Sequence, residues 1–225
     1  MNQILKKIRM ATPHWYLAAT LLLTCVSTGV AQKVRNQLPK KQHRDSNAPF
    51  LKPAEAVAKM SIPDGFEVSV FASEPDIAEP IAFCFDDRGR MWVAENFNYQ
   101  TRRQHTDDQV SRIQILEDTD GDGVFDKKKT FTDKLTFTSG LACGFGGVFV
   151  GSPPNLTFIP DADGDDKPDG PPEVLLDGWG IRDRHETLNS FIWGPDGWLY
   201  GCHGVFTHSN VGKPGAEDAR RQFID

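Results

Sequence analysis

Apolar and polar residues alternate in short runs along residues 80–200, and glycine-containing turns separate the runs. This period of two is typical of strands with one buried face. One kind of run, two strands joined by a glycine turn, occurs three times, at 80–94, 140–150 and 189–200. The sequence therefore predicts three related hairpins.

A second kind of hairpin lies between the first ones and has an aspartate-rich turn. Its copies span 113–131 and 156–176, and the equivalent residues Asp118 and Asp161 are 43 positions apart. Two hairpins make four strands, and four strands repeating about every 50 residues are typical of a β-propeller blade. We predict an all-β fold, a β-propeller of four-stranded blades, with its first strand near Phe66–Val70.

The chain is short for a complete propeller. Propellers close with about 4–8 blades, whereas 225 residues hold about two and a half. The expectation is the N-terminal part of a longer protein, with the propeller over 59–225.

The first 58 residues differ from the repeats. Residues 1–31 combine Lys6, Lys7 and Arg9 with an apolar run over 15–26 and end in small residues, which indicates a signal peptide. A polar linker follows at 32–58. The prediction is a secreted or periplasmic protein, and an uncleaved N-terminal segment would instead provide a membrane anchor.

Charge and cysteine content narrow the class of protein. A net charge of -6 argues against nucleic-acid binding as the main activity. Cys84 and Cys143 occupy equivalent places in two inner hairpins, where a small buried side chain is the simplest interpretation. With Cys202, the predicted propeller has an odd number of cysteines, so they cannot all pair within it.

Blade topology places the remaining loops on two sides. The hairpin turns and both aspartate-rich loops belong to one side, and the links over 96–110, 178–188 and 202–212 belong to the other. That second side collects four of the six histidines together with several arginines. Clustered titratable groups at propeller loops are candidates for binding and acid–base chemistry.

His185 is the candidate catalytic base of that side. An imidazole near its ordinary pKa accepts a proton at neutral pH, although a structural histidine bonded to a loop carbonyl is the alternative. Neighbouring cations would hold an anionic cofactor. The candidate cofactor-binding residues are Arg182, Arg184, Arg102, His105 and His203.

The aspartate-rich loops predict calcium binding. Both place carboxylates at positions one, three, five and nine, as in the first half of an EF-hand loop. Position twelve of the first loop is Lys129 instead of glutamate, and position six of the second is Asp166 instead of glycine. Acidic turns without a metal are the alternative. The candidate ligands are Asp118, Asp120, Asp122 and Asp126 in the first loop, and Asp161, Asp163, Asp165 and Asp169 in the second.

The segments 66–75, 89–95, 115–123 and 185–201 together resemble the planctomycete-type secreted propeller proteins of the membrane-bound dehydrogenase family. The propeller is similar, more distantly, to soluble quinoprotein glucose/sorbosone dehydrogenases. The resemblance implies pyrroloquinoline quinone as a cofactor, His185 as the base, and haem c in a downstream cytochrome module outside this chain.

Two functions follow as expectations. In the first, a secreted dehydrogenase-like propeller oxidises a sugar or alcohol and passes electrons to a quinone or a cytochrome c module. In the second, a non-catalytic scaffold binds a polysaccharide or a protein partner on the same side. This chain by itself is expected to be inactive as an enzyme.

Overall fold

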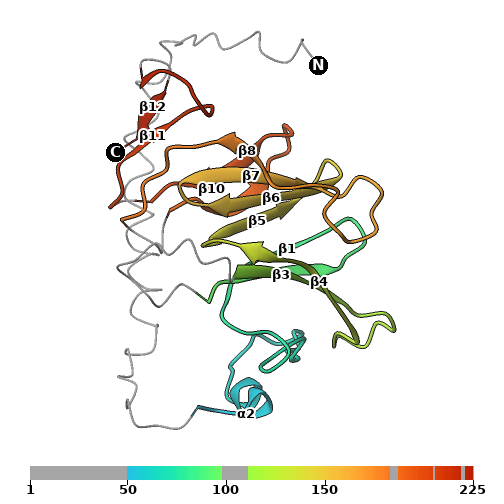
Figure 1. The fold of residues 1–225 in the computed structure, drawn as a ribbon. Helices are drawn as coiled ribbons and strands as arrows, with labels where there is room; N and C mark the ends of the chain where they lie inside the picture. Colours follow the sequence, from blue (N-terminus) through green and yellow to red (C-terminus); the bar gives the residue numbers. More distant parts are fainter. Residues whose placement is uncertain (1–49, 98–110, 183–186, 205, 219–220, 225) are drawn as a thin grey trace, which may run out of the picture. The chain divides into compact units, whose positions relative to one another are not determined.

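The described residues form antiparallel strands in two four-stranded sheets and two two-stranded hairpins (Figure 1). This fold is seen in a computed structural model that describes residues 50–97, 111–182, 187–204, 206–218 and 221–224. The predicted propeller region lies in the compact unit Leu51–Asp225. The predicted signal peptide and most of the predicted linker lie outside the described residues.

The first four-stranded sheet contains β1 (Pro80–Phe85), β2 (Met91–Glu95), β3 (Ser111–Glu117) and β4 (Lys127–Leu135) in sequential order. Its pairing is antiparallel throughout, with Cys84 opposite Trp92 and Trp92 opposite Ile115. We call it blade 1. Both of its hairpins match the repeats predicted from the sequence.

The second sheet repeats this order with β5 (Gly140–Cys143), β6 (Gly147–Ser152), β7 (Asn155–Pro160) and β8 (Glu173–Leu176). Cys143 pairs with Val148, and Phe149 pairs with Phe158. We call it blade 2. The prediction of an all-β fold built from four-stranded blades is therefore confirmed.

Two separate hairpins follow blade 2. The predicted opening hairpin of a third blade is formed by β9 (Asn189–Trp193) and β10 (Leu199–Cys202). A further pair, β11 (Ser209–Val211) and β12 (Gln222–Ile224), was not predicted. Its strands have three residues each, too few for an alternating pattern to stand out.

The hydrophobic core lies between blades 1 and 2. Trp92, Ile113 and Ile115 of blade 1 belong to the same buried cluster as Val148 and Ile159 of blade 2. The Trp92 and Phe131 rings meet edge to face at 4.9 Å. The apolar positions of the alternating strands therefore form the blade-to-blade interface, as propeller packing requires.

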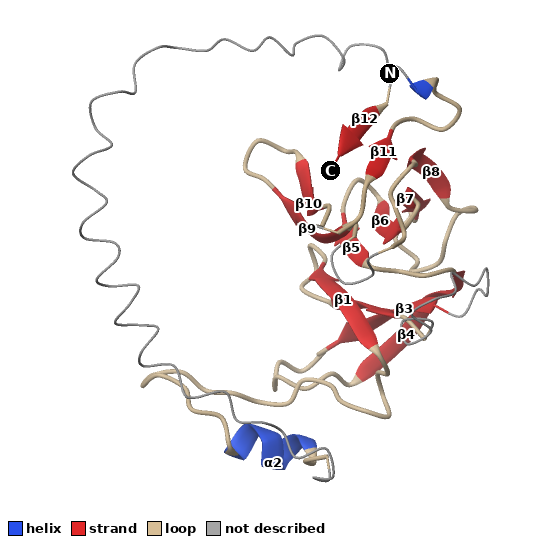
Figure 2. Cartoon of the chain, turned by 90° about the vertical axis from the view of Figure 1, so that its left-hand side faces the viewer, coloured by secondary structure: helices blue, strands red, loops and turns tan. Residues whose placement is uncertain are grey.

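The inner strands β1, β5 and β9 are neighbours in space, with β5 in the middle (Figure 2). Close packing there depends on glycine. A Cβ atom at Gly151 would lie 2.3 Å from the Leu188 carbonyl oxygen, so a larger residue would push apart blade 2 and the segment entering β9.

The segment before blade 1 differs from the prediction. Residues 66–70 form no strand; the segment instead meets the first aspartate-rich loop, where the Phe125 N–H donates to the Phe71 carbonyl over 3.3 Å. A single backbone bond does not make a ladder. The prediction of a first strand near Phe66–Val70 was therefore wrong, and β1 is the first strand.

A short helix, α2 (Pro53–Ala58), precedes that segment and begins with a proline, whose fixed φ suits the first helical turn. No helix of the described residues is long and apolar enough to cross a membrane.

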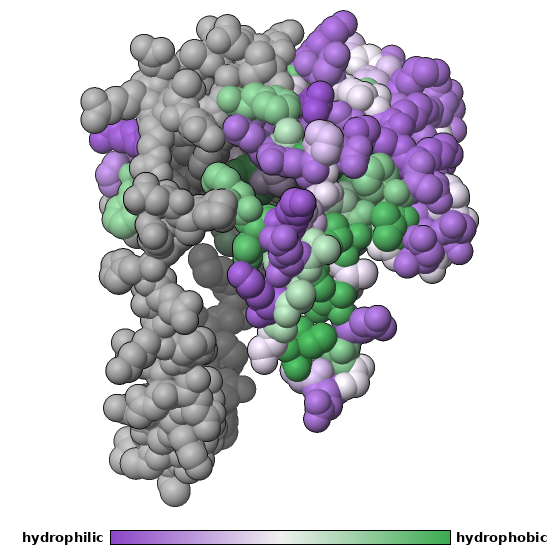
Figure 3. All heavy atoms as spheres, turned by 90° about the horizontal axis from the view of Figure 1, so that it is seen from below, coloured by the Kyte–Doolittle hydropathy of each residue, from purple (hydrophilic) through white to green (hydrophobic). Residues whose placement is uncertain are grey.

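Several large apolar side chains remain exposed on strand faces. Phe83 and Phe85 of β1 are 63% and 57% exposed, and Trp198 beside β10 is 67% exposed. Apolar side chains also gather on the face seen in Figure 3, next to a broad polar region.

Candidate metal centre

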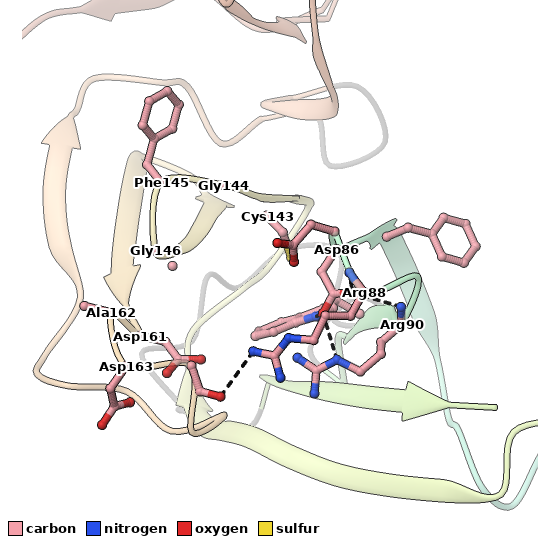
Figure 4. A pocket seen from close by; sticks show the side chains of 15 residues that line it. Asp86, Arg88, Arg90, Cys143, Gly144, Phe145, Gly146, Asp161, Ala162 and Asp163 are labelled. Atoms are coloured by element: carbon pink, nitrogen blue, oxygen red, sulfur yellow. Dashed lines mark hydrogen bonds and ion pairs between the residues drawn. The ribbon is translucent and has the colours of Figure 1, made fainter. Parts of the chain in front are cut away.

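The turns β1–β2, β5–β6 and β7–β8 together surround a cavity of about 480 Å³. Asp161 and Asp163 lie on its blade 2 side, and Asp86, Arg88 and Arg90 lie on its blade 1 side (Figure 4). The predicted grouping of hairpin turns on one side of the blades is consistent with this shared cavity.

The first aspartate-rich loop (residues 118–126, called loop 1) satisfies its carboxylates with its own backbone. Asp118 accepts hydrogen bonds from the N–H groups of Gly121 at 2.7 Å and Gly123 at 2.9 Å. Asp126 accepts from the Thr119 N–H and hydroxyl at 2.9 and 2.7 Å. Hydrogen bonds to the ionised form, led by that from Gly123, lower the pKa of Asp118.

The second aspartate-rich loop (residues 161–169, called loop 2) has the same backbone plan. The fourth and sixth positions have positive φ in both loops, at Gly121 (78°) and Gly123 (86°), and at Gly164 (69°) and Asp166 (66°). Aspartate tolerates the left-handed region better than most residues. The absence of glycine at position six therefore does not change the turn.

Asp161 makes loop 2 electrostatically different. Asp161 is only 8% exposed, and its Oδ1 atom is buried without a hydrogen-bond partner among the described residues. Burial raises the pKa of Asp161, and the charges of Asp166, Asp165 and Asp163 add to this effect; a backbone hydrogen bond from Asp166 opposes it. A buried carboxylate surrounded by other carboxylates calls for a compensating cation.

Three carboxylates converge in each loop. In loop 2 the potential ligand atoms of Asp161, Asp163 and Asp165 all lie within 4.8 Å of one another, and in loop 1 those of Asp118, Asp120 and Asp126 do so. Two further predicted ligands are bonded within their loops, since Asp122 accepts from the Val124 N–H at 2.8 Å and Asp169 accepts from the Ala162 N–H at 2.7 Å.

Blade 1 supplies the cations that hold loop 2 in place. Arg90 Nη2 lies 2.8 Å from Asp166 Oδ1, and Arg90 Nε lies 2.8 Å from Asp86 Oδ2. Arg88 donates to the Gly164 carbonyl at 3.2 Å, and Lys129 contacts the Asp165 carbonyl and lies 3.3 Å from Asp166 Oδ2. Lys129, position twelve counted from Asp118, thus reaches loop 2.

Asp86 anchors this arrangement within blade 1. Burial alone would raise the pKa of Asp86, but the Trp92 indole N–H at 3.0 Å and the backbone and guanidinium of Arg90 outweigh it and lower the pKa. The side chains of Arg90 and Asp86 are 6% and 7% exposed. They form a buried ion pair that continues to Asp166.

The sequence did not single out Asp86, Arg88 or Arg90 as functional. Their partners are distant in the chain, with Arg90 and Asp166 separated by 76 positions. Spacing within a loop gives no sign of such a contact.

The predicted residues of the opposite side are only partly visible. His185, Arg184, Arg102 and His105 lie outside the described residues, and Arg182 is exposed. His203 Nε2 lies 2.6 Å from Ser209 Oγ, and its Nδ1 lies 2.9 Å from the Gly204 carbonyl oxygen. Both ring nitrogens of His203 are thus bonded within the segment that leads to β11.

A buried carboxylate marks the other end of β2. Glu95 is fully buried, accepts from the Ala78 N–H at 2.5 Å and pairs with Arg112, whose guanidinium lies 5.1 Å from the Phe97 ring centroid. Glu95 and Arg112 thus form an ion pair at the end of β2, just before the segment that contains Arg102 and His105. This pair was not predicted from the sequence.

The fold is therefore that of a protein built from four-stranded, propeller-type blades, in which the turns on one side of the blades are rich in aspartate. Residues 52–224 match the model of a domain of unknown function, DUF7133, and the chain belongs to this family. No curated protein matches the chain.

Proposed function

We propose that this chain is a calcium-binding propeller module in which loop 2 holds the ion. The observation that carries the proposal is the buried, unpartnered Oδ1 atom of Asp161 beside the carboxylates of Asp163 and Asp165.

The geometry of the three carboxylates suits a calcium ion. Calcium takes oxygen ligands at about 2.3–2.6 Å, so two ligands on opposite sides of one ion lie about 5 Å apart. The candidate ligand atoms of Asp161, Asp163 and Asp165 all lie within 4.8 Å of one another, close enough for one ion to contact all three carboxylates. Hard carboxylate oxygens without nitrogen or sulfur ligands favour calcium, magnesium or manganese over softer metals.

The electrostatics of loop 2 favour the same interpretation. The raised pKa of Asp161 reflects an anion that is buried and repelled by its neighbours. A divalent cation would remove both costs, because it replaces the lost hydration and neutralises the converging charges.

A bound ion would act on the contact between blades. Loop 2 is already tied to blade 1 through Arg88, Arg90 and Lys129. An ion that fixes the loop would therefore stabilise the interface that contains the hydrophobic core. Its role would be structural and not catalytic.

Oxidation of a sugar or alcohol on the opposite side stays a prediction, as does binding of a polysaccharide or protein partner there. The proposed base His185 lies outside the described residues, so we carry the dehydrogenase hypothesis no further.

The proposal is tested by calcium titration of the full chain after treatment with EDTA. Isothermal titration calorimetry is expected to show a site whose affinity falls at least about 10-fold in Asp161→Asn, since affinity in such loops follows ligand charge. Asp133→Asn, which removes an exposed carboxylate of β4 outside both loops, is expected to bind as the parent does. Equal affinity of Asp161→Asn and the parent would refute the proposal.

A further inference from the structure

Two half-buried thiols meet between blades 1 and 2. Cys84 Sγ of β1 and Cys143 Sγ of β5 lie 3.5 Å apart, although 59 positions separate them in the chain. Both side chains pack against the core cluster that joins the blades. They occupy equivalent places in successive repeats, so their meeting follows from the stacking of the blades.

We propose that Cys84 and Cys143 are a disulfide site that covalently links the inner strands of the two blades. A disulfide bond is about 2.05 Å long, so the sulfur atoms would approach by about 1.5 Å. The inner strands β1 and β5 are already neighbours, and the bond requires no change in the order of the strands.

The surroundings hold the two cysteines in place. Trp193 donates its indole N–H to the Cys143 carbonyl at 2.8 Å. Cys84 lies opposite Trp92 in the β1–β2 ladder. Both cysteines therefore lie in hydrogen-bonded strands, and a cross-link there would join strands that already lie side by side.

The pair is chemically suited to thiol–disulfide exchange. The S–H of Cys143 stabilises a thiolate on Cys84 and lowers the pKa of Cys84, although burial opposes this effect. The same contact, together with burial, raises the pKa of Cys143, so Cys84 is the thiolate of the reduced pair. The thiolate is the form that attacks a disulfide. Cys143 lines the cavity on the turn side (Figure 4), which gives a small oxidant a route to the pair.

The step balances with a small disulfide as the oxidant. One cysteine thiolate attacks a sulfur of oxidised glutathione, forms a mixed disulfide and releases one glutathione thiolate. The second cysteine, as its thiolate, attacks the protein sulfur of the mixed disulfide and releases the second glutathione. Two protein thiols are oxidised, one glutathione disulfide is reduced to two thiols, and the cysteine protons end on those thiols or in water.

The test uses the full chain incubated with oxidised glutathione, then blocked with an alkylating reagent and digested without reductant. Mass spectrometry is expected to find the Cys84 and Cys143 peptides linked, with the loss of two hydrogens. A Cys25→Ser/Cys202→Ser variant, which keeps only this pair, is expected to give the same link. Cys202 is exposed, so its modification by glutathione in the parent is the control that shows that the oxidant is active.

Thermal unfolding supplies a second readout. A disulfide between Cys84 and Cys143 would close a loop spanning 59 positions. Closing it is expected to raise the Tm by about 10 °C, and reduction is expected to reverse the rise. The rise is expected in the Cys25→Ser/Cys202→Ser variant and not in Cys84→Ser. Recovery of Cys84 and Cys143 as separate alkylated peptides, while Cys202 carries glutathione, would overturn the proposal. So would a stable glutathione adduct on Cys143 without the link.

Discussion

Loops 1 and 2 share one sequence pattern and one turn geometry but differ in electrostatics. In loop 1 the first carboxylate, Asp118, accepts two backbone hydrogen bonds and has a lowered pKa. In loop 2 the equivalent Asp161 is buried, keeps an unpartnered oxygen and has a raised pKa. The difference arises from the burial of Asp161 and the charges of its loop 2 neighbours, and it shows that an aspartate motif alone does not define the state of its carboxylates.

The docking of loop 2 gives the largest expected effect. Arg90→Met leaves Asp86 and Asp166 without their buried partner, and breaking such pairs costs about 3–5 kcal/mol. The Tm, followed by circular dichroism, is expected to fall by about 10 °C. Lys127→Met breaks an exposed pair with Glu117 and is expected to cost less than about 1 kcal/mol. Similar losses in both variants would contradict a special role for the loop 2 contact.

Calcium provides the next largest effect. At a concentration about 100 times the Kd, a single site on the folded protein adds about 2.7 kcal/mol to its stability. We expect this gain, measured as a rise in Tm over the EDTA-treated protein, in full in the parent and in Asp118→Asn. In Asp161→Asn a 10-fold loss of affinity reduces the gain to about 1.4 kcal/mol or less. The reverse pattern would place the ion in loop 1.

Without calcium, Asp161→Asn is expected to be more stable than the parent at neutral pH, by about 1 kcal/mol, because it removes a buried and repelled anion. Below the ordinary pKa of 3.8 Asp161 is protonated in both states, and the gain vanishes.

As the pH rises from 3.8 towards the raised folded-state pKa, the unfolded parent loses this proton first. Its stability therefore falls relative to the variant, and above that pKa the difference stays constant. Thermal unfolding of both proteins in EDTA at several pH values measures this difference. A variant that is less stable at neutral pH would show that Asp161 is stabilised by contacts of its own.

The smallest expected effect concerns Lys167, whose Nζ lies 2.7 Å from Asp165 Oδ2. This exposed ammonium competes with a cation for Asp165. Lys167→Met is expected to raise calcium affinity by about 2- to 5-fold, the equivalent of a surface ion pair. Calorimetric titration beside the parent checks this, and unchanged affinity would mean that Asp165 does not coordinate the ion.

The fold was largely predictable from local patterns. Alternation and glycine turns gave β1, β2, β9 and β10 close to their observed bounds. The strand expected at 66–70 was wrong because an alternating segment also needs a partner strand with free backbone groups. Residues 66–70 pair with no described strand, and the next residue, Phe71, accepts a single backbone hydrogen bond from the Phe125 N–H.

The candidate site was predictable only in part. The aspartate positions were read directly from the two loops, and Asp161, Asp163 and Asp165 do converge. The contacts of loop 2 with Arg88, Arg90 and Lys129 were not foreseen, because those cations come from another blade. The cysteines were identified as equivalent in the repeat, but not as neighbours.

The sequence alone determined which residues form strands, where the turns occur and which of them carry carboxylates, since these properties depend on neighbours a few positions away. Only the tertiary structure decided which aspartate is buried, which cations of the neighbouring blade reach loop 2 and which thiols lie close together. Those outcomes depend on contacts between blades, and residues far apart in the chain meet there only once the sheets have stacked.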